Sequence, residues 1–119
     1  MFIIHCLTER AWNDCKNKTY YGEESLCKYG FIHCSEISTY RLVAPNFKKV
    51  IENLVLIVID SDLLENEVQV RWEDLNDCGI MFPHVYGLLN ISAVVETVPH
   101  LWNEHREWVV NNELLKYCD

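Results

Sequence analysis

Two short segments place side chains that can do acid–base or binding chemistry at alternating positions. The first is Gly30–Ser35, Gly-Phe-Ile-His-Cys-Ser, and the second is Phe82–Gly87, Phe-Pro-His-Val-Tyr-Gly. Side chains alternate between the two faces of a β-strand. Each segment therefore presents two polar groups on one face, namely His33 with Ser35 and His84 with Tyr86. If both strands belong to one sheet, these four side chains line one cleft.

An imidazole and a hydroxyl beside a helix N-terminus are groups that can bind an anion or a nucleotide. Ser35 is also a residue type that begins helices as an N-cap, so we expect a helix to start there. Each group has a structural alternative. His33 can be a core histidine with its ring hydrogen bonded to the backbone. His84 and Tyr86 can be half-buried aromatic groups with a satisfied polar end.

Four further residues are candidate site groups. Arg71 and Glu73 share one face of the alternating run 67–73, where they can form an ion pair of under about 1 kcal/mol, or Arg71 can hold a phosphate through two hydrogen bonds. Ser25 can bind a ligand or cap a helix, and His5 can face the cleft or end a sheet edge. The spacing of His5, His33 and His84 matches no zinc motif, so we predict no metal site, with a three-histidine zinc site as the alternative.

Composition and charge limit the class of protein. The 119 residues carry a net charge of −8, which disfavours nonspecific nucleic-acid binding because that binding needs a surface rich in Lys and Arg. No run approaches the roughly 20 apolar residues of a membrane span. Six cysteines form no Cys-x-x-Cys pair, and the first residues lack a basic segment before a long apolar run. We therefore expect a cytoplasmic protein with reduced thiols.

The hydrophobic pattern predicts an α+β fold in one domain, residues 1–119. The expected strands are 2–6, 31–34, 53–60, 67–73, 80–86 and 93–98. The continuous Val/Ile/Leu run at 54–60 should be the central strand, and Pro83 should place its strand at an edge or a bulge. We expect helices after Thr8 and Ser35 and an amphipathic helix over 99–117. Strands outnumber helices and do not alternate with them, so the sheet should be mostly antiparallel.

The chain resembles the bacterial domain-of-unknown-function 952 family. The similarity covers residues 1–98, and the helix at 99–117 is an addition. The most specific strings are Gly-Phe-Ile-His-Cys-Ser and Phe-Pro-His-x-Tyr-Gly. The other matching pieces are Ile4-His5, Trp12, Ser25-Leu26, Leu54–Asp60, Val70-Arg71-Trp72-Glu73 and Ala93-Val94-Val95.

The resemblance implies a compact relative of the ADP-ribosyltransferase fold, in which a split, mostly antiparallel sheet surrounds a cleft with flanking helices. Active members of that fold include NAD-dependent toxins and RNA 2′-phosphotransferases. The segment Phe31–Ser35 is similar to the phosphotransferases' strand, and His5 lies where a first-strand His or Arg would lie. In the toxin pattern, a stacking Tyr would stand where this chain has Ile32 or His33.

The resemblance implies His33 and Glu73 as catalytic residues of an ADP-ribosyl or phosphoryl transferase relative. It implies that His5, Ser25, Ser35, Arg71, His84 and Tyr86 bind NAD or another small phosphorylated ligand. The alternatives are a non-catalytic ligand-binding module and a protein-interaction domain. Two placements discriminate between them: His33, His84 and Tyr86 should line one open cleft if a ligand binds, and Glu73 should face that cleft near His33 for glycosidic chemistry.

Overall fold

The computed structural model describes residues 1–118, which form short helices and ten strands. The strands are β1 (Phe2–Thr8), β2 (Tyr20–Tyr21), β3 (Ile32–His33), β4 (Leu54–Asp60), β5 (Gln69–Glu73), β6 (Phe82–Tyr86), β7 (Leu89–Asn90), β8 (Val94–Pro99), β9 (Leu101–Trp102) and β10 (Trp108–Val109). The α-helices are α1 (Glu9–Cys15) and α2 (Glu23–Tyr29). The 3-10 helices are η1 (Ile37–Leu42), η2 (Ala44–Phe47), η3 (Ser61–Leu63), η4 (Ile91–Ala93) and η5 (Asn112–Tyr117). None of the helices in the described residues combines the length and apolar character that a membrane crossing requires.

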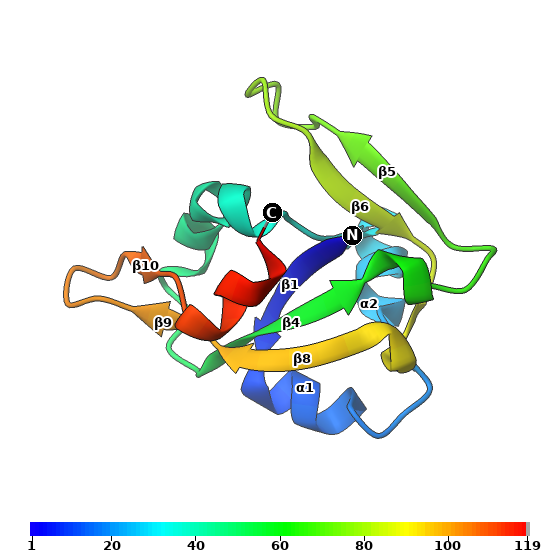
Figure 1. The fold of residues 1–119 in the computed structure, drawn as a ribbon, viewed down its shortest axis with the longest axis horizontal. Helices are drawn as coiled ribbons and strands as arrows, with labels where there is room; N and C mark the ends of the chain where they lie inside the picture. Colours follow the sequence, from blue (N-terminus) through cyan, green and yellow to red (C-terminus); the bar gives the residue numbers. More distant parts are fainter. Residues whose placement is uncertain (119) are drawn as a thin grey trace.

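The main sheet has the order β1–β4–β8 and is antiparallel throughout (Figure 1). The prediction that residues 53–60 form the central strand is confirmed, with the strand beginning at Leu54. Its side chains alternate between two apolar cores, with Ile57 in the core on one face and Leu56 in the core on the other, both fully buried. Burying such a side chain contributes about 1.5–3 kcal/mol, which explains why this strand is apolar at every position but its last.

A second antiparallel sheet has the order β3–β6–β5. The prediction that Pro83 lies on an edge strand or at a bulge is wrong, because β6 pairs with a strand on each side and its register with both strands is regular. Pro83 is tolerated at the point where β3 ends. Its carbonyl accepts a hydrogen bond from Cys34 N at 3.2 Å, and the N–H that would extend the pairing is missing. The β5–β6 hairpin extends away from the main sheet at the top of Figure 1.

Ser35 joins the two sheets. It exchanges two backbone hydrogen bonds with Ile4 of β1, at 2.8 and 2.9 Å, and its side chain is buried. The prediction that Ser35 caps a helix is therefore wrong. Glu36 precedes η1, which is a 3-10 helix, and Pro45 at the start of η2 separates the two short turns. The bridge fixes β3 beside the N-terminal strand and so positions His33 near His5.

Two helix boundaries follow from local chemistry. The Thr8 hydroxyl accepts a hydrogen bond from Ala11 N at 3.1 Å and caps α1, as predicted. Gly30 ends α2 in the left-handed conformation at φ +84°, which glycine adopts without a steric penalty. The short turn into β3 places the end of α2 beside His33.

The predicted helix over 99–117 is wrong. Strands β9 and β10 form a hairpin in which Trp102 lies opposite Trp108, and only the 3-10 helix η5 follows. The turn is fixed by the Asn103 side chain, which accepts hydrogen bonds from the backbone N–H groups of His105 and Glu107 at 2.9 Å. Arg106 adopts a positive φ of 60° in the same turn. The strand pairing and the packing of both tryptophans against the core thus outweigh the helical spacing of the apolar residues.

Candidate functional site

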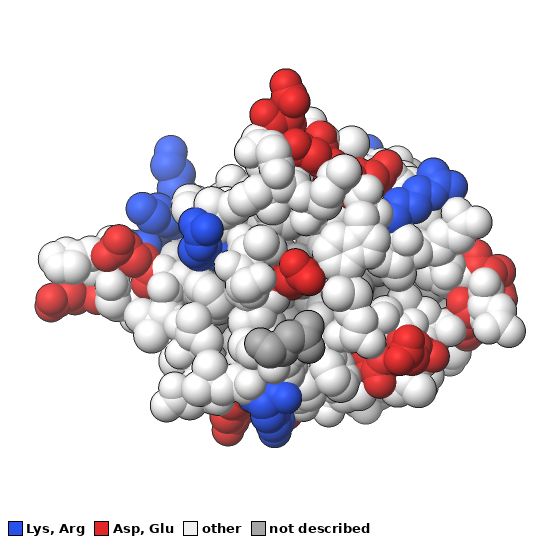
Figure 2. Space-filling model, turned by 45° about the horizontal axis from the view of Figure 1, so that its top comes forward, with Lys and Arg blue, Asp and Glu red and all other residues white. Residues whose placement is uncertain are grey.

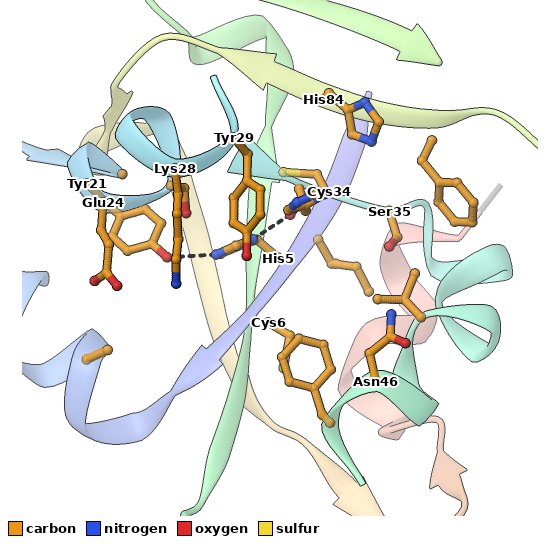
Figure 3. A pocket seen from close by; sticks show the side chains of 18 of the residues that line it. His5, Cys6, Tyr21, Glu24, Lys28, Tyr29, Cys34, Ser35, Asn46 and His84 are labelled. Carbon is orange, nitrogen blue, oxygen red and sulfur yellow. Dashed lines mark hydrogen bonds between the residues drawn. The ribbon is translucent and has the colours of Figure 1, made fainter. Parts of the chain in front are cut away.

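A pocket of about 1200 Å³ opens beside β1, α2 and β3, and we call it the central pocket (Figure 3). Its wall includes His5 of β1, His33 of β3 and His84 of β6. The segment 18–29 supplies another wall, from which the side chains of Glu24, Lys28 and Tyr29 extend in Figure 3. Chain segments far apart in sequence therefore converge on one space.

His5 forms part of a hydrogen-bonded chain within this wall. Its Nδ1 donates to the His33 carbonyl oxygen, which can only accept, so Nδ1 carries the proton. Its Nε2 then accepts from the Tyr21 hydroxyl at 2.8 Å. Burial lowers the pKa of His5 to about 4, so the ring is neutral near pH 7. Both ring nitrogens are used inside the protein, so the ring holds Tyr21 and the end of β3 in place.

Tyr21 was missed by the sequence analysis, although it lies between two predicted site residues. It lines the central pocket beside Ser25 and His5. Burial raises its pKa to about 12, and the Ser25 side chain acts in the opposite direction. The surrounding segment is polar and has no strand periodicity. The only local signal was an aromatic pair, Tyr20-Tyr21, in an otherwise polar loop.

His33 and His84 form the part of the pocket wall that belongs to β3 and β6. They lie directly opposite each other on β3 and β6, and their rings meet edge to face with centroids 5.7 Å apart. Phe31 stacks on the His84 ring at 4.3 Å. His33 is partly exposed, and partial burial together with the neighbouring His84 lowers its pKa. Two imidazoles with different surroundings therefore share one wall of the pocket.

A carboxylate lies behind His84. The Glu73 Oε1 accepts one hydrogen bond from the Tyr86 hydroxyl at 2.6 Å and another from His84 Nδ1 at 3.0 Å. These two bonds, from Tyr86 first and His84 second, lower the pKa of Glu73. The Arg71 guanidinium lies over the Tyr86 ring, 4.3 Å from its centroid. The cluster holds His84 from the side away from the pocket.

The structure divides the eight predicted site residues into two groups. His5, Ser25, His33, Ser35 and His84 line the central pocket. Arg71, Glu73 and Tyr86 are not among its lining residues and lie beside His84 on the β5–β6 sheet. Within residues 1–118, no three His, Cys, Asp or Glu side chains are grouped closely enough to hold a metal ion. His5, His33 and His84 therefore do not form the three-ligand set that the zinc alternative required.

The fold is that of a small α+β protein, and comparison with known proteins identifies its family. The chain is a member of the family described as Protein of unknown function (DUF952), whose match spans residues 6–97. The family assignment made from the sequence motifs is thereby confirmed. No match was found among curated proteins.

Solved structures of protein CC0527 from Caulobacter crescentus share this fold. The crystal structure has a TM-score of 0.79 at 23% identity and covers 96% of this chain and 98% of CC0527. The solution NMR structure has a TM-score of 0.71 at 23% identity, with 98% and 96% covered. At this identity the likeness concerns the fold. The finer relationship to ADP-ribosyltransferases remains a prediction.

Proposed function

We propose that the central pocket binds a small phosphorylated ligand of the nucleotide type, with NAD and ADP-ribose as the first candidates. The observation that carries this proposal is the convergence of histidines from β1, β3 and β6 on one open pocket. Its volume of about 1200 Å³ is large enough for a dinucleotide-sized ligand. The ADP-ribosyltransferase-like resemblance supports the same ligand class.

The wall residues supply the contacts that such a ligand needs. Lys18 and Lys28 line the pocket and can meet phosphate oxygens as point charges. Tyr29 is 54% exposed at the pocket edge and offers an aromatic face for a base. His33 makes no side-chain hydrogen bond within the described residues and is free to bind a ligand hydroxyl or phosphate. His5 acts indirectly by positioning Tyr21.

The overall charge distribution supports a local site for one small anion. In the face shown in Figure 2, acidic and basic side chains are interspersed, without a continuous basic surface. The net charge is −8, and Glu23 and Glu24 line the pocket together with Lys18 and Lys28, so a phosphate would be held by direct contact with the lysines and not by the field of the protein as a whole. We place this activity in the cytosol, where the six free cysteines would stay reduced.

Calorimetric titration and thermal shift with NAD, ADP-ribose, AMP and adenosine test this proposal. At 100 times its dissociation constant, a bound ligand should add about 2.7 kcal/mol to the free energy of unfolding. We expect the phosphorylated compounds to bind and His33→Ala to weaken them at least tenfold. His105→Ala is the matched control, because the His105 side chain is 74% exposed. Absence of binding by all four compounds would refute the proposal.

A protein-interaction role is the alternative, and the β5–β6 hairpin favours it. Trp72, Leu75 and Met81 on this projecting hairpin are 38%, 59% and 55% exposed. Self-association through these side chains can be measured by sedimentation of the wild type and of a Trp72→Ser, Met81→Ser variant. A concentration-dependent dimer that the double substitution abolishes would support this second role.

A further inference from the structure

Glu73 and His84 have the arrangement of a carboxylate that orients an imidazole. The ionised carboxylate can only accept hydrogen bonds, so the bond at 3.0 Å places the proton of neutral His84 on Nδ1. The lone pair of neutral His84 is then on Nε2. The His84 side chain is only 6% exposed and that of Glu73 is 27% exposed, so the pair is shielded from most of the solvent.

The remaining contacts of His84 fix the direction of its ring. Phe31 stacks on one face at an interplanar angle of 29°. Tyr86 shares the Glu73 oxygen and is itself covered by Arg71. Nε2 makes no hydrogen bond to any group in residues 1–118, and His84 stands at the upper edge of the central pocket in Figure 3. The free nitrogen is therefore available to a ligand or water in the pocket.

We propose that His84 is a general base that activates water to hydrolyse a pyrophosphate bond in the bound ligand, and that Glu73 is its positioning residue. This inference rests on the proposed function, since it requires the phosphorylated ligand in the central pocket. It assigns proton transfer to His84, which the sequence analysis regarded as a ligand-binding residue. Glu73, which that analysis regarded as catalytic, acts through His84.

The reaction balances with water as the only co-reactant. The water oxygen forms a bond to one phosphorus atom, and one water proton passes to Nε2 of His84 and then to solvent. The bond from that phosphorus to the bridging oxygen breaks, and its electron pair leaves with the second phosphate. The new phosphate loses its remaining water-derived proton to solvent at neutral pH. Glu73 compensates the positive charge that forms on the imidazole, as a carboxylate does in a catalytic triad.

A pyrophosphate fits this site because a phosphate can leave as a stable anion without a proton donor. An alkoxide leaving group would need an acid, and the lowered pKa of His33 makes that residue a weak candidate near pH 7. Glycosidic chemistry with Glu73 at the reacting carbon would need this carboxylate in the pocket. Its hydrogen bonds instead hold it behind His84. Lys28, which also lines the pocket, can offset part of the charge of the two phosphates.

The test uses ADP-ribose, with formation of AMP and ribose 5-phosphate followed by phosphorus NMR. We expect the wild type to form both products and His84→Gln to slow the reaction at least 100-fold, as loss of a general base does. Calorimetry should show that His84→Gln still binds ADP-ribose, so that the loss of rate is a loss of the chemical step. His105→Gln, prepared in the same way, should retain the wild-type rate.

Glu73→Gln distinguishes positioning from a purely structural role. We expect kcat to fall at least tenfold with KM nearly unchanged. Long-range proton–nitrogen NMR should show the Nδ1–H form of His84 in the wild type and a mixture of both forms in Glu73→Ala. A wild-type His84 with its proton on Nε2 would contradict the assigned geometry.

The outcomes separate this inference from the proposed function. Binding of ADP-ribose by the wild type without cleavage would overturn the inference and leave ligand binding intact. Cleavage at an equal rate in His84→Gln would also overturn it. If ADP-ribose does not bind at all, both the inference and the proposed function fail for this ligand class.

Discussion

Acid should destabilise the protein through His5. Burial lowers the pKa of His5 from 6.5 to about 4 in the folded state. Between these values the unfolded chain binds a proton on His5 and the folded protein does not. Stability therefore falls as the pH decreases through this range. Lowering the pH from 7 to 5 should reduce the free energy of unfolding by about 2 kcal/mol through this one residue.

Urea titrations at pH 7 and pH 5 measure this loss, and His5→Gln should remove about 2 kcal/mol of the pH dependence. His100 contributes a second, separate loss, since burial also lowers its pKa to about 4. His105→Gln is the control, because its side chain is 74% exposed.

An unchanged pH dependence in His5→Gln would refute the reasoning. If that variant does not fold, direct NMR titration of His5 in the wild type replaces it. The wild-type ring should remain neutral at pH 5, and a titration midpoint near 6.5 would contradict the buried hydrogen-bonded chain from His33 through His5 to Tyr21.

Two further substitutions test how the pocket wall is built. Tyr21→Phe should lower the free energy of unfolding by about 1–3 kcal/mol, because it leaves His5 Nε2 buried without its donor. Urea unfolding measures this change. A decrease below about 0.5 kcal/mol would show that water replaces the hydroxyl. Gly22→Ala should cost at least about 1 kcal/mol, because Gly22 has a φ of +116° and a methyl group there would overlap the Cδ1 of fully buried Ile32. A variant as stable as the wild type would contradict the packing of α2 against β3.

Local chemistry was a good guide where an element depends on its own residues. In the run Leu54–Asp60 every residue but the last is apolar, which indicates burial on both faces, and this run is the central strand. The Thr8 side chain itself caps α1, and Gly30 adopts the left-handed conformation because it has no Cβ. The predictions for the central strand and for Thr8 required no knowledge of distant partners.

Elements that depend on residues far away in the sequence could not be predicted from the local residue pattern. Strand β2 exists because Tyr20 and Tyr21 pair with β7, about 70 residues later in the chain. In the hairpin of β9 and β10, Trp102 lies opposite Trp108 on the neighbouring strand, although the same residues have a spacing that also suits a helix.

The candidate site shows the same division. Alternation along strands placed His33 and His84 on one wall, and the structure pairs them directly. Alternation also placed Tyr86 beside His84, but sequence could not show that Glu73 bonds to Nδ1 of His84. The side of a histidine that a carboxylate approaches is set by strand register and side-chain rotamer, which the residue pattern does not encode.

Binding of a nucleotide-type phosphorylated ligand in the central pocket is the property on which the proposed hydrolysis by His84 also depends. Its most direct test is proton–nitrogen NMR of the wild type during titration with ADP-ribose. We expect chemical-shift changes concentrated at Tyr21, Lys28, His33 and His84, which all line this pocket. Absence of shifts at millimolar ligand, or shifts confined to the β9–β10 hairpin, would contradict it.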